Sequence, residues 1–118
     1  MQEIDFNKDS FSDILARDRR YDAKAYALLL EAFSSIPHTN NISYIEILEE
    51  FKEVALNQYG PMAFTVLAEW GLNECMDIGE MMINLVESGR LAKNDTDNYE
   101  DFRNGYNFKD AFLDPYKA

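Results

Sequence analysis

The sequence has little of what most catalytic and metal sites need, with one cysteine and one histidine among 118 residues. A lone cysteine excludes an internal disulfide, and a thiolate metal site built from this chain alone would have too few ligands. No apolar run approaches the roughly 20 residues that span a bilayer. The first residues also lack a basic segment followed by an apolar one, so we expect a cytoplasmic protein that does not enter a membrane.

Positive charge is also scarce, since 11 basic side chains stand against 22 acidic ones and give a net charge of −11. Such a surface repels nucleic acid and anionic lipid, whose phosphates are bound by clustered Lys and Arg. The one basic concentration comprises Arg17, Arg19, Arg20 and Lys24. It could bind a phosphate or an acidic partner, but the aspartates that lie among these residues favour a self-compensated surface.

Apolar residues make up 47% of the chain and aromatic residues 14%, which is typical of a folded domain and excludes a disordered one. We predict a mainly α, compact helical domain over residues 1–118, with a winged-helix-like core and a small C-terminal β-hairpin. Its expected parts are a polar arm (1–9), N-terminal helices (10–58), a helix-turn-helix with a wing-like hairpin (59–108) and a tail (109–118).

Two helices stand out in the N-terminal half. Residues 23–35 are apolar on nearly all sides, so this helix is expected at the centre of the core. The next helix begins after Ser43, with Glu46 three residues on as in a capping box. Its outer face carries an acidic ridge of Glu46, Glu49, Glu50 and Glu53. Carboxylates on one convex helix face diverge, so a solvated face is favoured over a divalent-metal site.

The winged-helix outline comes from residues 61–91. Pro61 suits a first helical position, Gly71 ends the first helix and Gly89 ends the second. Gly79 is expected to permit close approach of another element. Residues 90–93 fit a short strand and 94–98 a turn, while residues 99–112 could form a returning strand, a helical turn or both.

A groove-reading second helix would present its outward side chains to DNA. In this outline those side chains are Asp77, Glu80, Asn84 and Glu87. Three carboxylates would be repelled by phosphates, so nucleic acid is an unlikely partner.

Candidate interaction residues lie in the basic group and in the tail: Arg17, Arg19, Arg20, Phe112, Leu113 and Tyr116. The tail residues either pack back onto the body or form an exposed docking strip. No catalytic, cofactor-binding or metal-binding residue can be assigned, and His38 fits a solvated loop. We therefore predict a non-catalytic protein-interaction module with an unknown protein partner, without a cofactor, and with its oligomeric state open. The alternatives are a winged-helix nucleic-acid-binding regulator and a carboxylate- or metal-dependent enzyme.

A resemblance rests on several short motifs: Tyr59-Gly60-Pro61-Met62-Ala63, Val66-Leu67, Trp70-Gly71, Asp77-Ile78-Gly79-Glu80, Leu85-Val86, Asp101-Phe102, Tyr106-Asn107-Phe108 and Phe112. Over residues 21–116 the chain resembles an uncharacterised bacterial family of small acidic proteins known by a "Minf" locus label. This chain differs from the usual pattern at Cys75, Arg90 and Asn107. The family has no assigned activity, so the resemblance implies a stand-alone domain and no mechanism.

Overall fold

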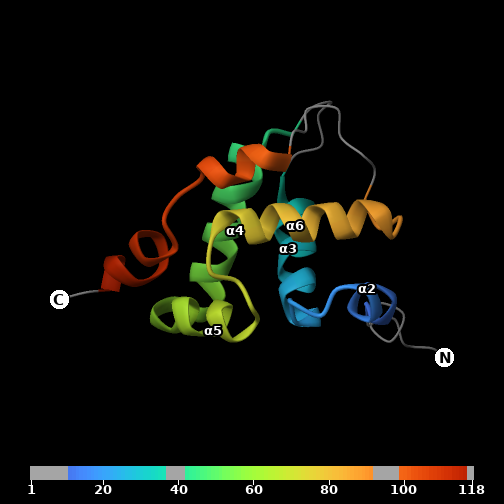
Figure 1. The fold of residues 1–118 in the computed structure, drawn as a ribbon. Helices are drawn as coiled ribbons and strands as arrows, with labels where there is room; N and C mark the ends of the chain where they lie inside the picture. The colour runs from blue at the N-terminus through green and yellow to red at the C-terminus, as the bar shows by residue number, and fades with distance from the viewer. Residues whose placement is uncertain (1–10, 37–41, 92–98, 117–118) are drawn as a thin grey trace.

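A computed structural model describes residues 11–36, 42–91 and 99–116, and these parts of the chain are helical (Figure 1). The longest helices are α3 (Ala23–Ser35), α4 (Tyr44–Tyr59) and α6 (Cys75–Glu87). The other elements are α2 (Ser12–Arg17), η1 (Gly60–Met62), α5 (Ala63–Glu69), η2 (Tyr99–Asn104), η3 (Lys109–Leu113) and η4 (Asp114–Tyr116). The predicted arm (1–9), the His38 loop and the turn at 94–98 lie outside the described residues.

Helices α3 and α4 pack side by side in opposite directions, and α6 crosses them (Figure 1). Helix α3 is capped by Asp22, whose side chain accepts a hydrogen bond from the Lys24 backbone N–H. It buries one side, including Tyr26, Leu28 and Leu29, and leaves the opposite side exposed at Lys24 and Ala27. The prediction that this helix is central to the core is confirmed.

Helix α4 begins as its sequence predicts. The Glu46 N–H donates to Ser43 Oγ at 3.2 Å and the Ser43 N–H donates to Glu46 Oε1 at 2.9 Å, so both halves of the capping box form. The apolar side of α4 is buried, with Phe51 fully enclosed. The acidic ridge (Glu46, Glu49, Glu50 and Glu53) lies on the outer side, where all but Glu50 are exposed.

The turn between α5 and α6 is fixed by Gly71, which has a φ of +97°. A Cβ at this position would collide with the carbonyl oxygen of Arg20, so only glycine lets the turn lie this close to the α2–α3 connection. The Asp22 N–H donates to the Trp70 carbonyl at 3.1 Å and ties the same two segments together. Leu72, in the same turn, is buried.

The predicted C-terminal β-hairpin is wrong, because the described residues contain no strand. Gly89 closes α6 with a Schellman motif, in which its N–H donates to the Val86 carbonyl and the Arg90 N–H donates to the Leu85 carbonyl. The Leu91 N–H also donates to the Leu85 carbonyl. Residues 90–91 therefore stay hydrogen-bonded to the end of α6 and do not start a strand. Without strands there is no wing, and the winged-helix-like core is corrected to a wholly helical arrangement of the described residues.

The segment expected to return as a strand is instead the 3-10 helix η2, which lies along α6 (Figure 1). Phe102 is its buried residue, and a Cβ on Gly79 would come within 2.9 Å of the Phe102 Cβ. Gly79 therefore admits another element, as predicted. The spacing of Tyr99 and Phe102 puts both rings on one side of a 3-10 turn, with centroids 6.5 Å apart.

Candidate functional site

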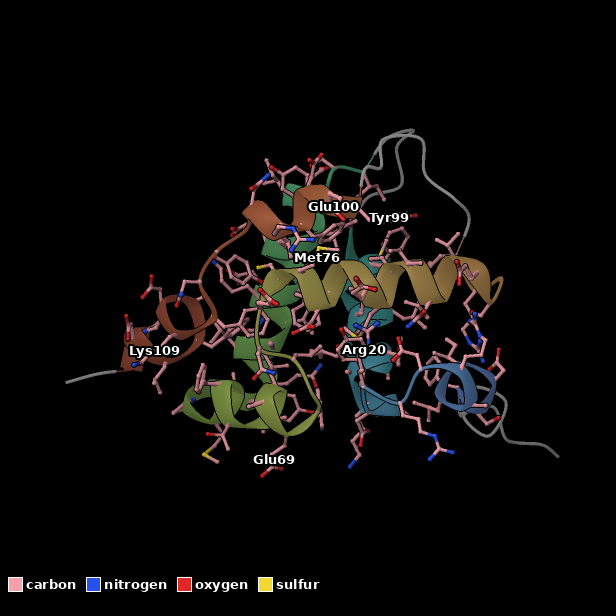
Figure 2. The ribbon with its side chains drawn as sticks, viewed as in Figure 1. Arg20, Glu69, Met76, Tyr99, Glu100 and Lys109 are labelled. Atoms are coloured by element: carbon pink, nitrogen blue, oxygen red, sulfur yellow. The ribbon has the colours of Figure 1, made fainter. Side chains whose placement is uncertain are left out.

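The polar face of α6 packs against the segment from Arg17 to Tyr26. Glu87 pairs with Arg17 at 3.2 Å, and Glu80 pairs with Arg20 at 3.2 Å. Figure 2 shows Arg20 beneath α6, on the side of the α2–α3 connection. We call this contact the polar seam, which comprises Arg17, Asp18, Arg20, Tyr21, Tyr26, Asp77, Glu80, Asn84 and Glu87.

Asn84 lies at the buried centre of the polar seam. Its side chain is 9% exposed, and its Nδ2 donates to Asp18 Oδ2 at 2.9 Å and to the Tyr26 hydroxyl at 3.0 Å. A buried amide without partners would cost free energy, so these two bonds are what makes its burial possible. Asn84 thereby joins α6 to α3 and to the residue that ends α2.

Asp18 is held from two sides. Arg20 donates to it through Nε at 2.9 Å and Nη2 at 2.7 Å, which is a bidentate pair. These hydrogen bonds, joined by the one from Asn84, hold the pKa of the Asp18 carboxyl well below its usual range although burial opposes them. Asp18 is therefore ionised at neutral pH and does not serve as a proton donor there.

Asp77 anchors the start of the polar seam. It accepts a hydrogen bond from the Tyr21 hydroxyl at 2.7 Å, and its other oxygen accepts from the Asn73 and Glu74 backbone N–H groups. Burial together with this carboxylate raises the pKa of the Tyr21 hydroxyl. The same aspartate therefore caps α6 and fixes the α2–α3 connection to it.

The polar seam corrects the expected orientation of α6. The side chains predicted to point outward into a nucleic-acid groove were Asp77, Glu80, Asn84 and Glu87. Each contacts its own chain, and Asn84 is buried. Arg17 and Arg20 do lie beside this helix, but each is paired with a carboxylate and they form no uninterrupted positive face.

The other predicted site residues lie in two places, with Arg19 between α2 and α3 and the tail residues in η3 and η4. Arg19 is exposed and lines a shallow groove of about 580 Å³ with Ser12, Leu15 and Asp22. Phe112 is fully buried, and its ring lies 5.0 Å from that of Phe108. Leu113 is half-buried on η3, and Tyr116 belongs to η4. The structure therefore places Phe112 in the core, apart from any surface strip.

Cys75 is buried at the start of α6, and its Sγ donates to the Tyr106 carbonyl at 3.2 Å. Burial raises the pKa of the thiol to about 12, which outweighs the opposite effect of that hydrogen bond. The thiolate needed for nucleophilic chemistry is thus almost absent at neutral pH.

A groove of about 240 Å³ lies between the start of α4 and the segment after η2. We call it the α4 groove, and its lining residues are Tyr44, Ile45, Leu48, Glu49, Asn104, Gly105 and Tyr106. Sequence reasoning missed this groove, because its two walls come from segments about sixty positions apart. Ile45, which the structure shows to be exposed on this acidic helix, is the one residue of the groove that stands out among its neighbours in the sequence.

Within residues 11–36, 42–91 and 99–116, no three His, Cys, Asp or Glu side chains are grouped so as to hold a metal ion. None of the helices described is both long enough and apolar enough to cross a bilayer.

Comparison with family models, with curated proteins and with solved structures finds no match for this chain. The resemblance to the Minf family stays a prediction.

Proposed function

We propose that this chain is a non-catalytic module that binds another protein through its acidic surface. The observation that carries the proposal is the acidic ridge on α4, whose Glu46, Glu49 and Glu53 are exposed on a chain of net charge −11. Among the described residues, Lys52 is the only cation paired with the ridge, through Glu49 at 3.3 Å. A concentrated field of one sign attracts a partner of the opposite sign and speeds their encounter.

Two further observations support binding over turnover. The thiol of Cys75 is buried and protonated at neutral pH, and Asp18 is ionised by its pairing with Arg20. The polar groups of α6 are engaged in the polar seam, where they join helices. Catalytic groups, in contrast, need access to a substrate and a pKa suited to proton transfer.

The experiment is capture of partners from the native host with a tagged chain and two charge-matched variants. The first variant carries Glu49→Gln and Glu53→Gln on the acidic ridge. The control carries Glu69→Gln and Asp110→Asn, two exposed positions elsewhere; Figure 2 shows Glu69 below α5. Both variants lose two negative charges, so a difference between them reports the position of the charge.

We expect a specific protein to be retained by the wild type and by the control and to be weakened by the ridge variant. The binding should also weaken as salt is raised, since exposed charges are screened within about 8 Å at physiological ionic strength. Equal retention by both variants would contradict the role of the ridge. Salt-sensitive binding of duplex DNA without a protein partner would contradict the proposal itself.

A further inference from the structure

The α4 groove contains an apolar side chain that the fold does not use. Ile45 is 57% exposed and lies beside Tyr44 and Leu48 on the groove wall. Met62, on η1, is the other large hydrophobic residue exposed to this degree among the described residues, at 56%, and it lines no described groove. Ile45 therefore combines exposure with a concave surface, whereas Met62 has exposure alone.

The walls of the α4 groove are fixed before any partner arrives. The Tyr106 hydroxyl donates to the Leu48 carbonyl at 2.8 Å and holds the two walls together. A Cβ on Gly105 would come within 2.6 Å of Leu48 Cδ1 and 2.7 Å of Cys75 Sγ, so this wall lies directly on the helices without a side chain between. A preformed groove spares a ligand the entropy cost of ordering it.

Charge decides which ligand suits this groove. Glu49 lines it, and Glu46 and Glu53 are exposed on the same helix. The cation beside it, Lys52, is paired with Glu49 and lies 5.4 Å from the centre of the Tyr106 ring. Arg103, which precedes the lining residue Asn104 in the chain, is paired with Glu100 at 2.9 Å. The surroundings of the groove are thus net negative around an apolar centre.

We infer that the α4 groove binds a basic segment of a partner protein, with an aliphatic side chain against Ile45 and a Lys or Arg beside Glu49. This inference rests on the proposed function and adds the place and the chemistry of recognition. The apolar contact supplies affinity, and the surrounding carboxylates select positive charge over negative charge. A volume of about 240 Å³ is suited to one or two side chains rather than to a whole helix.

The experiment uses three fluorescein-labelled nine-residue peptides, alternating Lys with Leu, Lys with Ser, or Glu with Leu. Fluorescence anisotropy measures affinity, and ¹H–¹⁵N spectra locate the contact. We expect saturable binding of the Lys-Leu peptide, with shifts centred on residues 45–49 and 104–106. Binding of the Lys-Ser peptide should be about tenfold weaker, and the Glu-Leu peptide should not bind, since only the first probe offers both apolar contact and positive charge.

Two substitutions make the test specific to the groove. Ile45→Ser should weaken the Lys-Leu peptide by about tenfold, whereas Met62→Ser, at an equally exposed position, should change it by less than about twofold. Both side chains are exposed, so unchanged melting temperatures are expected for both variants. Equal weakening by the two variants, or shifts centred away from the groove, would overturn the inference.

The same variants separate this inference from the proposed function. A native partner retained equally by the wild type and by Ile45→Ser would overturn the groove assignment and leave the interaction function in place. A chain that retains no protein at all would overturn both. Loss of the native partner in Ile45→Ser but not in Met62→Ser would support both.

Discussion

Replacing Asn84 by alanine should destabilise the protein more than its small size change suggests. The substitution removes a hydrogen bond to the Asp18 carboxylate and another to the Tyr26 hydroxyl. Bonds to charged groups contribute about 1.5–3 kcal/mol and neutral ones about 0.5–1.5 kcal/mol. Alanine regains about 0.5 kcal/mol through its higher helix propensity. We therefore expect the free energy of unfolding to fall by about 1.5–4 kcal/mol, most of it from the carboxylate bond.

The assay is urea denaturation followed by circular dichroism, with Asn57→Ala as the matched control. Asn57 is an exposed asparagine on α4, so its replacement should change stability by less than about 0.5 kcal/mol. A double-mutant cycle of Asn84→Ala with Tyr26→Phe isolates the bond to the hydroxyl. We expect a coupling of about 0.5–1.5 kcal/mol between these two substitutions.

The reasoning would be refuted if Asn84→Ala were as mild as Asn57→Ala. That result would mean that the amide is solvated and that α6 does not lie against α3 through the polar seam. A large loss of stability for Asn84→Ala without coupling to Tyr26→Phe would contradict only one of the two hydrogen bonds. It would support the bond to Asp18 and refute the one to the Tyr26 hydroxyl.

Three other outcomes are expected. Gly89→Ala should lower the free energy of unfolding by about 1–2 kcal/mol, because alanine is strained in the left-handed conformation. In the same thermal melts Gly71→Ala should lower it further, because its Cβ would also collide with the Arg20 carbonyl. Equal losses of stability for the two variants would contradict the close approach of Gly71 to Arg20. The Cys75 thiol should be inert to a thiol-specific disulfide reagent at neutral pH until urea unfolds the chain, and rapid labelling of the folded protein would contradict its burial. Because the folded pKa of Asp18 is lowered, the unfolded state binds more protons in acid, so stability should hold from pH 7 to about 4 and fall below it. Denaturant titrations should show a shallower fall for Asp18→Asn, and identical slopes would refute the pairing.

Local sequence signals were sufficient for the helices themselves. The Ser43–Glu46 capping box formed because both partners lie within one turn. Gly89 ended α6 because its positive φ is open to glycine. The largely apolar pattern of residues 23–35 predicted a core helix, and the structure buries one side of α3 while Lys24 and Glu31 lie exposed on the other.

The hairpin prediction failed because residues 99–112 carry two competing patterns. Tyr99 and Phe102 are three apart, which suits a 3-10 turn, whereas Tyr106 and Phe108 are two apart, which suits a strand. The 3-10 turn places the Phe102 ring against α6, where the missing side chain of Gly79 leaves room for it. That contact joins positions over twenty residues apart, so no short window of sequence contains it.

By itself the sequence determined the helical class, the Ser43–Glu46 capping box, the Gly89 helix end, the acidic ridge and the negative charge, because each of these depends on neighbours within a turn or two or on composition alone. Only the tertiary structure decided where the polar face of α6 lies and where the α4 groove forms. Asn84 meets Asp18 across 66 positions and Tyr106 meets Leu48 across 58. Contacts over such distances depend on how whole helices pack, and the free energy of that packing is shared among many residues that no local pattern identifies.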